Sequence, residues 1–293
     1  MLCALSTGKL EYMRRRIQGG RRGFQSVWLL LGLLMLAPWT AGHCEAPAAA
    51  ITAFDAYIAR EEVRLADQHR TGTGFVAAAG PIGSVGLISQ TEARLRKGEL
   101  IIEKLTPAAE AELPGAMLHD WRGTAYVRGV TVADFERLMK DFAAYPKRFA
   151  PQVIQTTILT RQDPSHFTVS MRVRQHHVIT VVMDTTYATT FGRLDALHAY
   201  SISRSTRISE IGWAGTAQER ALSDGEEHGF LWRLNTYWSY EERNGGLYMQ
   251  IESVSLTRSI PAGLGWLIRP FVESVPRESL EFTLQAVCNA LRK

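Results

Sequence analysis

Cysteine is scarce in this sequence, with three residues in a chain of 293. Cys3 and Cys44 lie in or beside the first 46 residues, which leaves Cys288 as the only cysteine well inside the remaining chain. A disulfide framework is therefore excluded for the body of the protein, and its stability must come from an apolar core. Cys288 lies among apolar positions of a predicted C-terminal helix, so we expect a packed thiol and not a nucleophile.

The body of the chain also lacks an excess of either charge. The whole sequence carries a net charge of +4, from 33 basic and 29 acidic residues. Residues 1–46 hold six of the basic and two of the acidic residues, which leaves 27 of each sign in the rest. Binding to a phosphate backbone requires concentrated positive charge, so we predict no nucleic-acid partner.

No apolar run is long enough to span a bilayer comfortably. The longest, Val27–Trp39, has 13 residues and follows a basic stretch that ends at Arg22. This layout predicts a signal peptide over residues 1–46 and a periplasmic or secreted protein, with an uncleaved membrane anchor as the alternative. The sequence RRGF at Arg21–Phe24 resembles a twin-arginine export motif, although arginines that only supply charge for ordinary secretion explain it as well.

Recognised catalytic and metal-binding motifs are missing too. The sequence has no HExxH, CxxC, GxSxG or EF-hand pattern, so we predict no metal site and no cofactor. The glycine-rich segment 71–86 lacks the spacing of a phosphate-binding loop and is expected to be a flexible, partly packed connection. Adjacent histidines His176 and His177 would point to opposite faces of a strand and would not form one site.

What the sequence does contain is a regular succession of elements. An amphipathic helix is predicted over Ile51–His69, within an N-terminal region of residues 47–97. After residue 98 we expect two strands, a helix over Thr131–Phe149 and then many strands with period-two alternation. The expected strands span residues 99–105, 116–129, 153–160, 167–173, 178–191, 200–208, 230–240 and 247–256. The sequence NGG at 244–246 predicts a hairpin turn, and the fold class is α+β.

The chain closes with a long predicted helix that contains Pro270 and Pro276. Proline inside a helix costs about 3 kcal/mol, so we expect breaks there. They would let the helix follow a curved surface, either as kinks fixed by packing or as a hinge. Two apolar stripes are expected to face the sheet: Leu264, Leu267, Ile268, Phe271 and Val275, followed by Leu280, Leu284, Val287 and Leu291.

Three stretches resemble the START-like (SRPBCC) superfamily, which includes polyketide cyclases and lipid-transfer domains. They are ITVVMDTTYATTFGRLDALHAYSISRSTRI, HGFLWRLNTYWSYEE and SVSLTRSIPAGLGWLIRPFVESVPRESLEFTL. The resemblance covers residues 98–293. It implies a helix-grip fold, in which a curved antiparallel sheet wraps around the long C-terminal helix. It also implies a cavity for an apolar ligand between the sheet and that helix.

Polar side chains within apolar strand faces are the candidates for ligand recognition. Arg204 shares its predicted face with Ile202 and Ile208, and a buried arginine needs an anionic partner. We therefore predict that Arg204 lies on the concave face below residues 264–275. Its partner would be the polar end of a ligand, or else Glu252 or Asp184. The predicted cavity residues are Arg204, Tyr187, Met183, Trp232, Trp238, Tyr240, Leu267 and Phe271.

Three classes of function are compatible with this pattern. The first is an exported protein that binds or carries a hydrophobic, lipid-like small molecule and contacts membranes transiently. The second is a cyclase- or dehydratase-like enzyme acting on an apolar substrate, for which Tyr187, Arg204 and Tyr237 are the candidate groups. The third is a cell-envelope protein that binds a protein partner. The oligomeric state is left open.

Overall fold

One antiparallel sheet of ten strands organises the chain. The computed structural model describes residues 45–70, 74–76, 85–107, 110–176, 179–260 and 265–292. The main strands are β1 (Ile101–Lys104), β3 (Ala116–Arg128), β10 (Gly246–Arg258), β9 (Arg233–Arg243), β7 (His198–Gly212), β6 (Thr180–Arg193), β5 (His166–His176) and β4 (Val153–Arg161), in that spatial order. Short β2 (Glu112–Leu113) pairs with β3, and short β8 (Arg220–Ala221) pairs with β7. These pairings confirm the expected α+β class.

The β9–β10 turn is the hairpin that the sequence predicts. Arg243 pairs with Gly246, so the loop consists of Asn244 and Gly245. Their φ angles are 56° and 75°. Positive φ at both central residues is the requirement of a type I′ turn, which matches the right-handed twist of the strands that it joins.

The helix expected over residues 131–149 is divided into three pieces. Thr131 caps α4 (Val132–Lys140), and the side chain of Asp134 completes a capping box. A 3₁₀ turn, η2 (Phe142–Ala144), and α5 (Tyr145–Arg148) follow. Pro146 explains the division, because proline lacks an N–H donor and fits the first turn of a new helix better than the interior of an old one.

The long helix α6 (Gly265–Leu291) packs on one face of the sheet, which we call the inner face. Leu280, Leu284 and Val287 are buried there, so the second predicted stripe is confirmed. Gly123 of β3 allows the close approach, because a Cβ at this position would lie 2.5 Å from Leu284 Cδ1. The expected breaks are wrong, because α6 is one continuous helix that includes Pro270 and Pro276.

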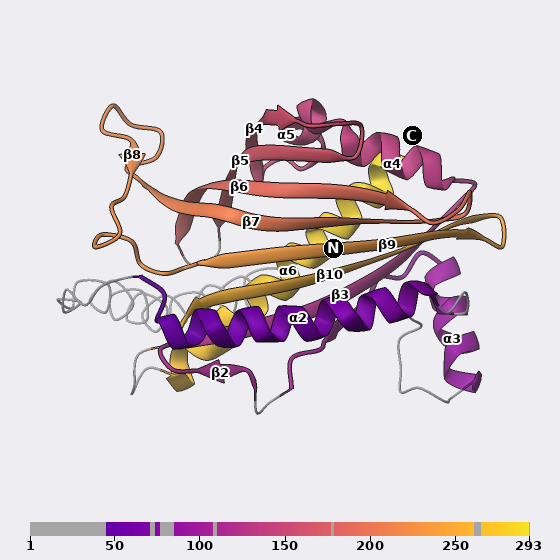
Figure 1. The fold of residues 1–293 in the computed structure, drawn as a ribbon, viewed down its shortest axis with the longest axis horizontal. Coiled ribbons are helices and arrows are strands. Elements are labelled where there is room, and N and C mark those ends of the chain that lie inside the picture. Colours follow the sequence, from indigo (N-terminus) through magenta and orange to yellow (C-terminus); the bar gives the residue numbers. More distant parts are fainter. Residues whose placement is uncertain are drawn as a thin grey trace, which may run out of the picture. The chain divides into compact units, whose positions relative to one another are not determined.

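The opposite face of the sheet, which we call the outer face, is covered by α2 (Ala48–Arg70). Figure 1 shows α2 in front of the sheet and α6 behind it. Phe54, Tyr57 and Leu65 of α2 are buried with Tyr237 and other side chains of β3, β9 and β10. The central strands therefore have both faces covered.

A smaller cluster joins the N-terminal segment to the end of the sheet. Leu95 of α3 (Val85–Arg96) packs with Phe75, Val76 and Tyr248. Among the described residues, none of the helices is both long and apolar enough to cross a membrane.

Candidate functional site

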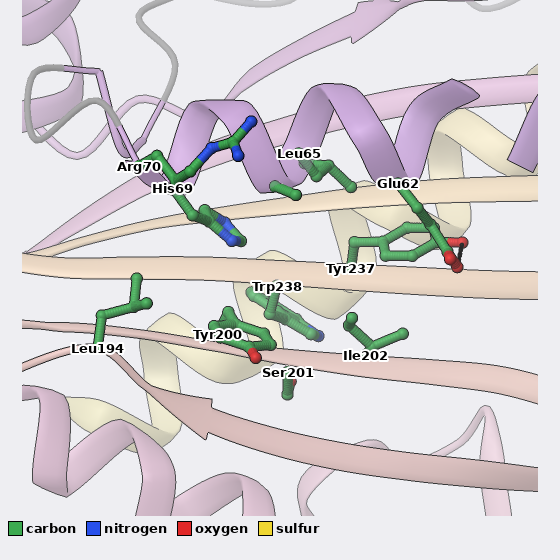
Figure 2. Close-up of a pocket in the computed structure, with 11 residues that line it drawn as sticks. Glu62, Leu65, His69, Arg70, Leu194, Tyr200, Ser201, Ile202, Tyr237 and Trp238 are labelled. Carbon is green, nitrogen blue, oxygen red and sulfur yellow. Dashed lines mark hydrogen bonds between the residues drawn. The ribbon is translucent and has the colours of Figure 1, made fainter. Parts of the chain in front are cut away.

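A pocket of ≈ 240 Å³ lies between α2 and the outer face at strands β7 and β9 (Figure 2). Helical spacing brings one face of α2 to the pocket, and strand alternation turns the side chains of Tyr200 and Ile202 of β7 towards it. The lining residues are Glu62, Leu65, Ala66, His69, Arg70, Leu194, Tyr200, Ser201, Ile202, Tyr237 and Trp238.

The walls of the pocket are mainly aliphatic and aromatic. Leu65 from α2 faces Tyr200 and Ile202 from β7 across it. The ring of His69 stacks on Tyr200 and on Phe75, with centroid separations of 5.1 and 4.6 Å. Such rings supply a large apolar contact area with few rotatable bonds, which suits recognition of a hydrophobic group.

Glu62 forms the polar end of the pocket. Its Oε1 accepts hydrogen bonds from Arg204 Nε at 2.8 Å and from the Tyr237 hydroxyl at 3.0 Å. Arg204 Nη2 also lies 2.7 Å from the same oxygen. Burial is the main cause that raises the pKa of Tyr237, so this hydroxyl is a neutral donor at physiological pH. A polar group of a ligand would meet the carboxylate of Glu62 and the hydroxyl of Tyr237 here.

His69 provides the second polar group of the pocket. Its Nε2 lies 2.8 Å from Ser239 Oγ on β9. Burial, followed by the charge of Arg64, lowers the pKa of His69 to about 4. The imidazole is therefore neutral near pH 7 and can offer either a donor or an acceptor.

The predicted position of Arg204 is wrong. Arg204 pairs with Asn235 in the β7–β9 ladder and shares the outer face with Tyr237, whereas Ser201 pairs with Trp238 on the inner face. Its partner is Glu62 of α2, and its side chain keeps 44% of its accessible surface. Of the partners that the sequence suggested, Glu252 binds Arg64 and Asp184 binds Arg172.

The remaining predicted cavity residues are divided between the two faces. Trp238 and Tyr240 belong to the inner core with α6, and alternation from Phe191 along β6 places Met183 and Tyr187 on the same side. Trp232 packs with α2 on the outer face. The side chains of Leu267 and Phe271 lie outside the described residues. The predicted set therefore does not line a single cavity, although Trp238 borders the α2 pocket.

The groups suggested for catalysis are separated as well. Tyr187 is buried on the inner face, and burial raises its pKa to about 12. Arg204 and Tyr237 contact Glu62 on the outer face. A shared active site of these three residues is excluded. Cys288 is buried and its pKa is raised to about 11 by burial, as expected for a packed thiol.

Sequence reasoning missed the α2 side of the site. The apolar stripe of α2 was recognisable, but nothing in it identified the sheet face that it covers. One usable signal was the presence of Asp120 and Glu252 within otherwise apolar strands, where a charged residue on a buried face needs a partner.

No family model matches the sequence, and no curated protein matches it at a significant level. Solved structures do match. The STAR-related lipid transfer protein of Xanthomonas axonopodis is 15% identical, with 66% of this chain and 99% of that chain covered and a TM-score of 0.42. The Zhui aromatase/cyclase of Streptomyces sp. R1128 is 12% identical, with 60% and 94% covered and a TM-score of 0.41.

A START superfamily protein of Mycobacterium smegmatis is 13% identical, with 59% of this chain and 97% of that chain covered and a TM-score of 0.39. The helix-grip arrangement itself is confirmed by the antiparallel sheet and α6 of this chain. Ligands and activities of these neighbours are properties of those proteins.

Proposed function

We propose that this protein binds or carries a small hydrophobic molecule with one polar end, and that the pocket under α2 is its binding site. The observation that carries this proposal is the composition of the pocket. Aliphatic and aromatic walls from Leu65, Tyr200 and Ile202 end at the polar groups of Glu62 and Tyr237, and Arg204 binds Glu62 from outside the lining. Apolar walls with a few convergent polar groups are the general design of small-molecule sites.

The size of the pocket limits the ligand. At ≈ 240 Å³ it is slightly smaller than the roughly 300–1,000 Å³ that is typical of ligand pockets. A short acyl chain or a small ring system fits this volume, and a longer lipid would extend past Arg70 or Leu194 at the margin.

The space between the inner face and α6, expected from the sequence, is a second location for such a ligand. Met183 and Tyr187 are buried on that face. The backbone of α6 lies close to β1, β3 and β10, whereas β5 reaches α6 through Gln175, which donates to Ser279 Oγ at 3.2 Å. Large apolar side chains on the strands opposite the helix support this location.

Export is part of the same proposal. The basic stretch and the apolar run of residues 1–46 support a signal peptide, and the mature chain would begin between His43 and Ala50. N-terminal sequencing of the protein from its own host tests this, and a cytosolic chain that retains the apolar run Val27–Trp39 would contradict it.

Native mass spectrometry of the protein purified from its own host tests the binding proposal. We expect the wild-type protein to retain a hydrophobic molecule. Ala66→Phe adds a ring at a residue that lines the pocket, so this variant should lose the molecule. Val63→Phe is the matched control, because it adds the same ring to α2 at a side chain that is 62% exposed and outside the lining.

The outcomes separate the alternatives. Retention of the hydrophobic molecule by wild type and Val63→Phe, but not by Ala66→Phe, supports binding in the α2 pocket. Equal retention by all three proteins contradicts the pocket and favours the inner face. A wild-type protein without any small molecule but with a stable protein partner contradicts the binding function and favours the partner-binding class.

A further inference from the structure

Beside the pocket, α2 covers two carboxylates that are fully buried on the outer face. Asp120 of β3 and Glu252 of β10 each have 0% exposed surface. They are diagonal neighbours on adjacent strands, since Glu252 pairs with Arg122 and Val254 pairs with Asp120. Glu61 of α2 joins them, and one carboxylate oxygen from each of the three residues lies within 4.8 Å of the others.

Each buried carboxylate is held by a donor on one oxygen only. The Tyr57 hydroxyl donates to Asp120 Oδ2 at 2.8 Å, and Arg64 Nη2 donates to Glu252 Oε1. The second oxygens, Asp120 Oδ1 and Glu252 Oε2, are buried and accept no hydrogen bond from the described residues. A buried polar atom without a partner costs free energy, so native proteins nearly always provide one.

The charge around these two oxygens is also unbalanced. Three carboxylates face Arg64, whose Nε also donates to Glu61 Oε2 at 2.5 Å. Arg122 lies on the same face, but its guanidinium binds Glu103 at 2.9 Å. Burial is the main cause that raises the pKa of both Asp120 and Glu252, and repulsion adds to it, from Glu252 on Asp120 and from Glu61 on Glu252. A positive charge between the two unpartnered oxygens would remove this imbalance.

We propose that Glu61, Asp120 and Glu252 form a binding site for a hard divalent cation such as Ca²⁺, Mg²⁺ or Mn²⁺. Asp120 Oδ1 and Glu252 Oε2 are the ligand atoms from the sheet, and a carboxylate oxygen of Glu61 is the ligand from α2. An all-oxygen ligand set favours hard cations over Zn²⁺ or Cu²⁺, which prefer nitrogen and sulfur. Tyr57 and Arg64 orient the two sheet carboxylates through their other oxygens, as outer partners do in known metal sites.

Cation binding by the full chain tests this site. After treatment with EDTA and removal of the chelator, calorimetric titration with Ca²⁺, Mg²⁺ and Mn²⁺ should detect one site per chain. The same cations should raise the melting temperature, because they bind only the folded protein. Asp120→Asn and Glu252→Gln each keep the shape and remove a charge, and each should lower the affinity about 100-fold or more.

A control variant and a less deeply buried ligand variant complete the test. Glu92→Gln removes one acidic side chain outside the cluster, where Glu92 binds Arg243, and should leave cation affinity unchanged. If either buried variant fails to fold, Glu61→Gln replaces the helical ligand, whose side chain is 17% exposed, and should weaken binding about tenfold.

Two results would overturn the proposal. One is a wild-type protein whose melting temperature and heat of titration ignore all three cations. The other is Asp120→Asn binding cations as tightly as wild type. A wild-type protein that ignores cations, together with an Asp120→Asn variant of higher stability at neutral pH, would show that the two carboxyls share a proton instead.

Discussion

The inner and outer faces of the sheet are built from alternate residues of the same strands, yet they are held to their helices in different ways. On the inner face, Trp238 and Ile251 join an apolar and aromatic core with Leu280 and Leu284 of α6. On the outer face, their neighbour Glu252 is bound to α2 through Arg64. Further directional contacts across this face are Tyr57–Asp120, Glu62–Arg204, Glu62–Tyr237 and His69–Ser239.

This difference separates two kinds of stability. Apolar burial depends on contact area and does not itself change with pH. Ion pairs and buried carboxylates depend on protonation and on bound ions. Changes in pH and in cation concentration should therefore affect the packing of α2 much more than the packing of α6.

The largest effect should come from the inner face. Leu284→Ala removes a fully buried side chain from α6 and should lower the free energy of unfolding by about 2–5 kcal/mol. The loss should be similar at pH 5 and pH 7.5. Urea denaturation measures both values, with exposed Glu281→Ala on the same helix as the control. A loss below about 1 kcal/mol would contradict close packing of α6 on β3.

The next effect should come from the outer face and depend on pH. Arg64→Met leaves buried Glu252 without its donor, and we expect a loss of about 2 kcal/mol at pH 7 in EDTA. The loss should shrink as pH falls through the raised pKa of Glu252, because its carboxyl then takes up a proton. Arg60→Met, one turn earlier on α2, removes an exposed pair with Glu110 and should change stability by less than about 0.5 kcal/mol. Equal losses in both variants would argue against a buried role for Arg64.

Asp120→Asn should have a smaller effect with the opposite sign. The folded pKa of Asp120 is raised above the unfolded value of about 3.9, so the folded chain binds more protons over the interval between them. The contribution of Asp120 is thus complete below about pH 4 and is lost as pH rises. In EDTA the variant should gain about 1 kcal/mol at pH 7 and show a flatter pH profile. A steeper profile in urea titrations would contradict this assignment.

His69 should produce the reverse slope within the same interval. Its pKa is lowered to about 4 in the folded protein, from an ordinary value of about 6.5. Its contribution is present above pH 6.5 and is lost as pH falls towards 4. His69→Phe keeps an aromatic ring on Phe75 and Tyr200 and should reduce this acid-induced loss. Melting temperatures at pH 7.5 and 5 measure it, and an unchanged difference would contradict burial of a neutral imidazole.

Arg204→Met should have the smallest effect on stability. Arg204 is half-exposed, and Glu62 keeps the hydroxyl of Tyr237 when the guanidinium is removed. Exposed ion pairs contribute about 0–1 kcal/mol, so we expect a loss of about 0.5 kcal/mol by urea denaturation. A loss above 2 kcal/mol would show that the packing of α2 on the outer face depends on the Glu62–Arg204 ion pair.

The sequence was sufficient to predict the strands and the packing of the C-terminal helix. Period-two alternation identified the strands, and the stripe that includes Leu284 and Val287 identified the buried side of α6. These signals are local, because each is contained in one element. The α4–α5 boundary was missed at Pro146, although a proline that suits a helix start was present.

The face of Arg204 could not be predicted, because both faces of the sheet are covered. On β7 the outer face carries Tyr200 and Ile202, whereas the inner face carries Ser201 and Ser203. The polarity of this strand alone therefore suggests that Tyr200, Ile202 and Arg204 face α6, whereas in the structure they face α2. The carboxylate cluster was hidden for a different reason. Glu61, Asp120 and Glu252 come from three elements distant in sequence, and only the tertiary fold brings them together.

The pairing of β3 with β10 also determines when this protein can fold. Residues 116–128 have β1 and β2 as early neighbours, but their long partner strand spans residues 246–258, far later in the sequence. Contacts of such large sequence separation slow folding, since the loop between them must close before they form. A ribosome-bound chain that ends before residue 246 has neither the β3–β10 ladder nor Glu252. We therefore expect the sheet, and everything that α2 covers, to be completed only after residue 258 has been synthesised.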